Sequence, residues 1–238
     1  MQKIFLRRAK EVVKADEVIS QAVQDYLKMV YHLQQAKKGV TTKAISDEMR
    51  VSAASVTNMV KKLVEMGLLR HTPYQEITLT HSGEKIALEV IRHHRLLELY
   101  LKEALGYPWD QVHDEAEKLE HVISEEFEER IDRVLGRPAT DPHGSPIPGR
   151  DGKIKERDLI SLTDIEMGRS VVIRWVRGQE PERLQYLESL GLLPDVVVKV
   201  FEKKPFNGPL LIQIGSSNKR EMIGQELAQQ IWVGIKKK

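Results

Sequence analysis

A segment rich in proline and glycine at residues 136–157 separates two parts of the chain that differ in hydrophobic periodicity. Before it, apolar residues recur at three- and four-residue intervals, which predicts amphipathic helices. After it, short apolar runs at 171–176, 196–201, 210–214 and 231–235 alternate with Gly, Pro and Asn, which predicts strands and turns, and a helix is predicted near 181–190. The sequence therefore predicts an α+β protein in which a helical part precedes a small β-barrel domain at residues 158–238.

The helical part begins with the element order of a winged helix-turn-helix. A first helix over residues 19–33 precedes a short helix capped by Thr41 or Thr42, and Ser52 caps a third helix. Apolar runs within residues 68–79 predict a β-hairpin. The residues of the third helix that are expected to face inward are Val56, Val60, Leu63 and Val64.

The outward face of the third helix is predicted to bind DNA. A small polar first turn would let the helix approach the major groove, and its free amides favour phosphate. Asn58 could read a base edge, whereas Lys61 and Lys62 could contact phosphates. A small helical domain that binds protein is the competing interpretation. The outward residues are Ser52, Ala54, Ser55, Thr57, Asn58, Lys61 and Lys62.

Charge is distributed unevenly along the helical part. Residues 1–80 carry 13 Lys/Arg against 8 Asp/Glu, whereas residues 81–140 carry 8 Lys/Arg against 14 Asp/Glu. A basic first third suits a polyanionic partner, and an acidic middle suits cations. Both patterns are also compatible with ordinary solvated helix surfaces.

A helix predicted over about 109–135 carries a cluster of residue types that bind metals. At about 100° per residue the cluster occupies an arc of roughly 100° beside the apolar stripe. A buried carboxylate is costly unless it is paired or bound to a metal, so this arrangement favours a metal site. The cluster consists of His113, Glu117, Glu120 and His121.

The preceding helix, predicted over about 82–105, places His94 in its inward stripe and Glu98 one turn later. A lone buried His is more often a core residue, but the ligand cluster on the next helix makes metal binding the favoured reading. The chain contains no cysteine, so nitrogen and oxygen donors remain. Such donors suit Mn²⁺, Fe²⁺, Co²⁺ or Zn²⁺.

The sequence gives little support to enzymes or membrane proteins. It has no HExxH motif, no Gly-rich phosphate loop and no nucleophile elbow, so no catalytic role is expected. No run of about 18 apolar residues occurs, and the N-terminus has no apolar stretch of signal-peptide length. We therefore expect a cytoplasmic protein without a membrane partner.

Three strings resemble the diphtheria toxin repressor family of iron- and manganese-dependent repressors: HRLLE at 94–98, VHDEAEKLEH at 112–121 and PHGSPIPG at 142–149. The resemblance covers about residues 20–150, and the C-terminal barrel is similar to the family's SH3-like domain. It implies a homodimer that binds operator DNA with a metal as corepressor. The implied divisions are a DNA-binding domain at 1–80, a metal-binding and dimerisation domain at 81–140, a linker at 141–157 and the SH3-like domain at 158–238.

The resemblance also implies two ligand sets. One comprises Asp25, Glu117, Glu120 and His121, and the other comprises His94, Glu98 and His113. Iron-responsive members usually have Met and Cys at the positions of Asp25 and Glu117. Two carboxylates there resemble the manganese transport regulators and fit Mn²⁺, with Fe²⁺ as the other choice.

One residue departs from the manganese regulators, because Lys28 stands where they have a further acidic ligand. Their closely spaced second ion is therefore not expected here. Instead, the barrel could complete the second site through Gln179, Glu180 or Glu182. Alternatively, the barrel binds a proline-rich peptide or stabilises the protein passively. Two other functions stay open: a winged-helix regulator that senses an organic ligand, and a metal-buffering or trafficking protein.

Overall fold

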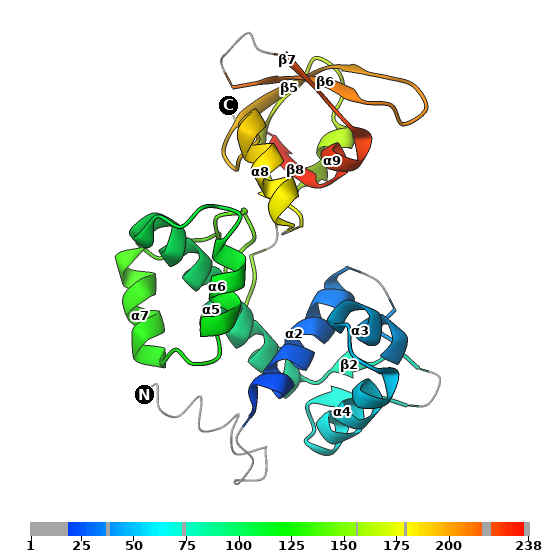
Figure 1. Cartoon of the computed structure of the whole chain (residues 1–238), viewed down its shortest axis with the longest axis vertical. Helices are drawn as coiled ribbons and strands as arrows, with labels where there is room; N and C mark the ends of the chain where they lie inside the picture. Colours follow the sequence, from blue (N-terminus) through cyan, green and yellow to red (C-terminus); the bar gives the residue numbers. More distant parts are fainter. Residues whose placement is uncertain are drawn as a thin grey trace. The chain divides into compact units, whose positions relative to one another are not determined.

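The computed structural model describes residues 19–36, 39–72, 75–155, 157–178, 180–215 and 220–235. The chain divides into two compact units, each described here by itself (Figure 1). The first contains residues up to 93 together with 148–153, and the second contains residues 94–147 together with 154–238. Within the described ranges, none of the helices combines the length and apolar character needed to span a bilayer.

The first unit has the predicted order of a winged helix-turn-helix, consisting of α2 (Gln21–Gln35), α3 (Thr42–Met49), α4 (Ala53–Glu65), β1 (Leu69–Arg70) and β2 (Thr78–Leu79). The side chain of Thr41 accepts a hydrogen bond from Ala44 N and caps α3, and Ser52 caps α4 in the same way through Ser55 N. The hairpin pairs antiparallel, with Leu69 opposite Leu79. The sequence therefore predicted the helix caps and the hairpin correctly.

One inward assignment on α4 was wrong. Val56, Val60 and Leu63 are buried, but Val64 is 36% exposed. At 100° per residue Val64 lies beyond the edge of the stripe that the other three define, so it reaches the surface. The buried stripe of α4 is therefore narrower than the sequence predicted.

The helix predicted over 109–135 is two helices. After α5 (His81–Leu105), the chain forms α6 (Val112–Leu119) and α7 (Glu125–Val134). Ser124 starts α7 by accepting a hydrogen bond from Phe127 N, and three glutamates follow in its first turn. Such a cap with acidic residues at a helix N-terminus favours a new start over continuation. Glu120 and His121 consequently lie in the turn after α6 rather than within a helix.

The C-terminal part of the second unit is an antiparallel six-stranded sheet in the order β3-β8-β4-β5-β6-β7. The elements are β3 (Ile160–Ser161), η1 (Leu162–Asp164), β4 (Ser170–Val176), α8 (Pro181–Leu190), β5 (Val197–Lys203), β6 (Leu210–Ile214), β7 (Arg220–Ile223), α9 (Gln225–Gln229) and β8 (Ile231–Ile235). The sequence predicted β4, α8, β5, β6 and β8. It missed β3, β7 and α9, which are too short to show a clear periodicity.

Candidate metal centre and nucleic-acid interface

The side chains of His94, Glu98 and His113 converge between α5 and α6. His94 Nε2 lies 3.0 Å from Glu98 Oε1 and 2.9 Å from His113 Nδ1. His113 Nδ1 lies 3.3 Å from the same carboxylate oxygen. His94 and Glu98 are one turn apart on α5 and both are buried, which explains why they face α6 together. The structure thus brings together the second predicted ligand set.

The spacing of these three atoms fits a coordinated cation. An octahedral ion with bonds of about 2.1–2.2 Å holds neighbouring donor atoms about 3.0–3.1 Å apart. Two imidazole nitrogens 2.9 Å apart need a shared proton or cation between them, because two lone pairs repel. The donor set therefore suits a divalent transition metal, and the hydrogen bonds hold the same geometry without one.

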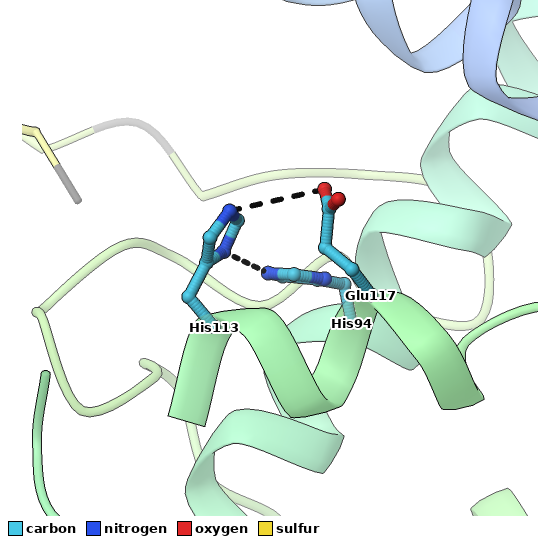
Figure 2. A group of neighbouring side chains, drawn as sticks. All are labelled: His94, His113 and Glu117. Atoms are coloured by element: carbon cyan, nitrogen blue, oxygen red, sulfur yellow. Dashed lines mark hydrogen bonds and ion pairs between the residues drawn. The ribbon is translucent and has the colours of Figure 1, made fainter. Parts of the chain in front are cut away.

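Glu117 approaches the second ring nitrogen of His113. Figure 2 shows dashed lines from His113 to both His94 and Glu117: His94 contacts Nδ1, and Glu117 Oε1 lies 3.8 Å from Nε2. The side chain of Glu117 is 53% exposed, unlike that of buried Glu98. Glu117 is therefore positioned to close the solvent side of the group.

Two other predicted ligands, Glu120 and His121, come directly after the end of α6. Glu120 is buried, and its two oxygens contact different imidazoles: Oε2 lies 2.5 Å from His94 Nδ1 and Oε1 lies 3.3 Å from His121 Nε2. Asp25 lies on α2 in the other unit. That Asp25 binds the same metal ion as Glu117, Glu120 and His121 therefore stays a prediction.

Sequence reasoning missed two buried residues that face Glu98, namely Asp141 and His143. Asp141 Oδ1 accepts hydrogen bonds from the main-chain nitrogens of His143 and Ser145, which forms a tight turn. His143 Nδ1 lies 3.9 Å from Glu98 Oε2, and ligand atoms of all three side chains lie within 4.8 Å of one another. In the sequence, the string at 142–149 indicated only the family, although its His143 could also have indicated a metal ligand.

The facing atoms of Glu98 and His143 are unsatisfied. His143 Nε2 lies 3.1 Å from the main-chain oxygen of Trp109, so Nε2 carries the proton and neutral His143 presents a lone pair at Nδ1. Among the described residues, Glu98 Oε2 and His143 Nδ1 are buried without a hydrogen-bond partner. When His143 is neutral, both atoms are acceptors and suit a cation. When His143 is protonated, its Nδ1–H faces Glu98 Oε2 at 3.9 Å, and the ion pair offsets part of the desolvation cost.

The electrostatics of this group centre on Glu98. Burial alone would raise the pKa of Glu98, but the charge of His94 and hydrogen bonds from neighbouring imidazoles hold it well below its usual range. Burial would lower the pKa of His143, yet the Glu98 carboxylate outweighs burial and raises it. Burial and then repulsion from Glu98 raise the pKa of Asp141. A divalent cation would relieve the repulsion between the two carboxylates.

The barrel residues proposed as further ligands are Gln179, Glu180 and Glu182. Gln179 falls outside the described residues. Glu180 pairs with Arg183 at 3.1 Å, and Glu182 is exposed in the first turn of α8. Over the part of the chain that the structure describes, the groups of His, Asp and Glu that could hold a metal contain no barrel side chain.

The predicted DNA-contacting face of α4 is exposed at all seven positions. Three of its hydroxyls bond within the helix: those of Ser52 and Ser55 lie 2.8 Å apart, and Thr57 donates to the main-chain oxygen of Ala53. This leaves one amide and two ammonium groups as the longest polar side chains of the face. They belong to Asn58, Lys61 and Lys62.

Comparison with known proteins matches each part of the chain to a domain family. Residues 19–77 match the iron dependent repressor N-terminal DNA binding domain. Residues 80–149 match the iron dependent repressor metal binding and dimerisation domain, and residues 160–234 match the FeoA domain.

Individual relatives and structures agree with these matches. The iron-dependent repressor IdeR of Mycobacterium leprae (strain TN) is 33% identical over 207 residues, which cover 81% of this chain and 89% of the relative. The diphtheria toxin repressor of Corynebacterium diphtheriae is 35% identical over 128 residues, covering 53% of this chain and 56% of the relative. A solved manganese-dependent transcriptional repressor in complex with manganese has a TM-score of 0.81 at 38% identity, covering 89% of this chain and 98% of that chain.

Proposed function

Because this chain belongs to the iron-dependent repressor family, we propose that it represses transcription by binding operator DNA as a homodimer when loaded with Mn²⁺ or Fe²⁺. One observation carries the metal dependence: imidazole and carboxylate donors converge in a buried group, two of whose atoms lack a hydrogen-bond partner. We also propose the division into a DNA-binding domain at 1–80, a metal-binding and dimerisation domain at 81–140, a linker at 141–157 and an SH3-like domain at 158–238. We place its action in the cytoplasm, where operator DNA is found.

Two ligand groups would hold the metal. In one, His94, Glu98 and His113 supply donors at the spacing of a coordinated ion, and Glu98 Oε2 extends the group to His143 and Asp141. In the other, Glu120 and His121 would join Glu117 and Asp25. All donors are nitrogen or oxygen, and carboxylates outnumber imidazoles in the set that contains Asp25. Such a set favours the harder ions, Mn²⁺ above all.

A bound divalent ion would have a structural role here, because it would neutralise the charge of the clustered carboxylates. Asp25 belongs to α2 beside the DNA-reading helices, whereas Glu120 and His121 belong to the second unit. If these residues bind one metal ion together, the two units lose freedom relative to each other. The recognition helices of a dimer would then hold a fixed separation, which selects the arrangement that fits two operator half-sites.

The test is operator binding by the full chain with chelator and with Mn²⁺, Fe²⁺ and Zn²⁺ under anaerobic conditions. We expect tight binding with Mn²⁺ or Fe²⁺ and weak binding with chelator. Glu126→Gln is a matched control, because Glu126 is exposed on α7 and pairs with Arg130. Equal affinity of chelated and metal-loaded protein would overturn the corepressor assignment and favour a regulator that senses an organic ligand.

A further inference from the structure

Trp109, in the segment between α5 and α6, is buried among residues of the barrel. Its side chain is 2% exposed and belongs to an apolar cluster whose other members, including Leu184 and Leu187 of α8, all come from the barrel. The next residue makes a polar contact with the same helix, because Gln185 Nε2 donates to Asp110 Oδ2 at 2.7 Å. The barrel therefore docks on the loop that leads into α6.

The same tryptophan positions His143. The indole stacks on the imidazole with ring centroids 5.2 Å apart and planes inclined by 30°. The Trp109 carbonyl binds His143 Nε2, and Trp109 Nε1 donates to the main-chain oxygen of Pro142 at 3.1 Å. These contacts fix both the ring orientation and the protonated nitrogen of His143, so that Nδ1 faces Glu98.

The barrel also holds the turn that carries His143. The main-chain nitrogen of Val176, at the end of β4, donates to the His143 oxygen at 2.9 Å, and Arg157 donates to the Gly144 oxygen. Gly144 has a φ of +89°, and a Cβ there would lie 2.1 Å from the main-chain oxygen of Arg174. Only glycine permits this close approach of β4 to the turn.

We propose that Trp109 and the barrel act as a clamp on His143, so that barrel docking and cation binding by Glu98 and His143 strengthen each other. This inference rests on the proposed metal site at Glu98. It assigns the barrel a role that needs no barrel ligand: among the described residues, the groups of His, Asp and Glu that could hold a metal contain no barrel side chain, whereas the barrel's main chain bonds to the turn that carries His143. Linkage between two equilibria is reciprocal, so each must strengthen the other by the same factor.

The first experiment measures Mn²⁺ binding to the full chain by the electron paramagnetic resonance signal of free Mn²⁺. Trp109→Ala removes the stacking ring and should weaken the Glu98-dependent binding step about tenfold, while Trp109→Phe keeps a ring and should restore most of that affinity. Gln185→Ala disturbs the docking without touching a ligand, and it should weaken the same step about threefold. Gln229→Ala, at an exposed position on α9, is the matched control and should bind as the unmodified protein does.

The second measurement is amide hydrogen exchange in peptides from β4 and β6. Mn²⁺ should slow exchange at Val176, whose N–H bonds to His143, and should leave β6 unchanged. Unaltered exchange, together with full affinity of the Gln185→Ala and Trp109→Ala proteins, would overturn the clamp. A Glu98→Gln protein separates the two ideas. If it loses a binding step while the clamp variants lose nothing, only the clamp fails; if it binds Mn²⁺ normally, the metal site itself fails and the clamp with it.

Discussion

The buried polar groups around α5 and α6 and the exposed polar face of α4 use their hydrogen-bonding capacity in opposite ways. Around Glu98, imidazoles and carboxylates bond to one another, and two buried atoms have no hydrogen-bond partner. On α4, hydroxyls bond to their own helix, and the longer side chains extend into solvent. Removing a buried partner leaves others uncompensated, whereas removing an exposed one costs only its own contact. Substitutions at the buried group should therefore have larger and less selective effects.

The largest effect is expected at Glu98, because its carboxylate faces His94, His113 and His143. Glu98→Gln keeps the shape but removes the charge that balances the imidazoles and the ion. We expect Mn²⁺ affinity to fall about 100-fold, or about 2.8 kcal/mol. Calorimetric titration with Mn²⁺ measures this loss, with Glu129→Gln as control because Glu129 is exposed and pairs with Arg133. A loss below threefold would show that the buried group does not hold the ion.

A smaller but more selective effect is expected at Asn58. If its amide makes a bidentate contact with a base, Asn58→Ala should relax the preference at that base by about 1–3 kcal/mol. Operators with single base-pair changes, compared under metal-loaded conditions, locate the position that loses discrimination. An affinity loss that is uniform over all operators would contradict base reading by Asn58 and would leave the backbone as its contact.

These two regions also differ in how far the sequence predicted them. On α4, the cap at Ser52 and the helical period fix which residues face outward, since both signals are local. His94, Glu98 and His113 were predictable for the same reason, because the ligands recur at helical spacing on two adjacent helices. Local signals thus account for the outward face of α4 and for three residues of the buried group.

The rest of the buried group depends on non-local structure. His143 meets Glu98 across 45 residues through a turn without periodicity, and its orientation comes from Trp109 and from β4. The break after α6 was also missed, because a continuous helical period hid the capping role of Ser124. Glu120 nevertheless reaches His94 from the turn, so the residue types were informative even where the predicted helix was wrong.

The choice of metal should respond to two carboxylates of the predicted ligand set, Asp25 and Glu117. Replacing Asp25 with Met and Glu117 with Cys makes the set softer and less anionic, so Fe²⁺, Co²⁺ or Ni²⁺ should gain on Mn²⁺ by about tenfold. Operator binding titrated anaerobically with each metal measures the ranking. His121→Ala should instead lose activation by every metal, because it removes a ligand without softening the set. Identical rankings for the double variant and the unmodified protein would refute the role of these carboxylates in selectivity.

The smallest effect is expected at Lys61, an exposed ammonium group on α4. A phosphate contact releases condensed counterions, so its loss should reduce the slope of log affinity against log salt by about 0.9. Lys61→Ala should weaken all operators alike, because phosphates carry no sequence information. The loss should shrink at high salt, unlike the loss at Glu98, where burial excludes the screening ions.

A matched lysine makes this last test specific. Lys118 is also exposed, but it lies on α6 and pairs with Glu115 at 3.0 Å. Lys118→Ala removes the same net charge from a helix that carries no predicted DNA contact, so its salt slope should stay unchanged. Equal slopes for the Lys61 and Lys118 variants would mean that only overall charge matters. In that event Lys61 would not bind the phosphate backbone. A role of the exposed face of α4 in DNA binding would then depend on Asn58 and Lys62.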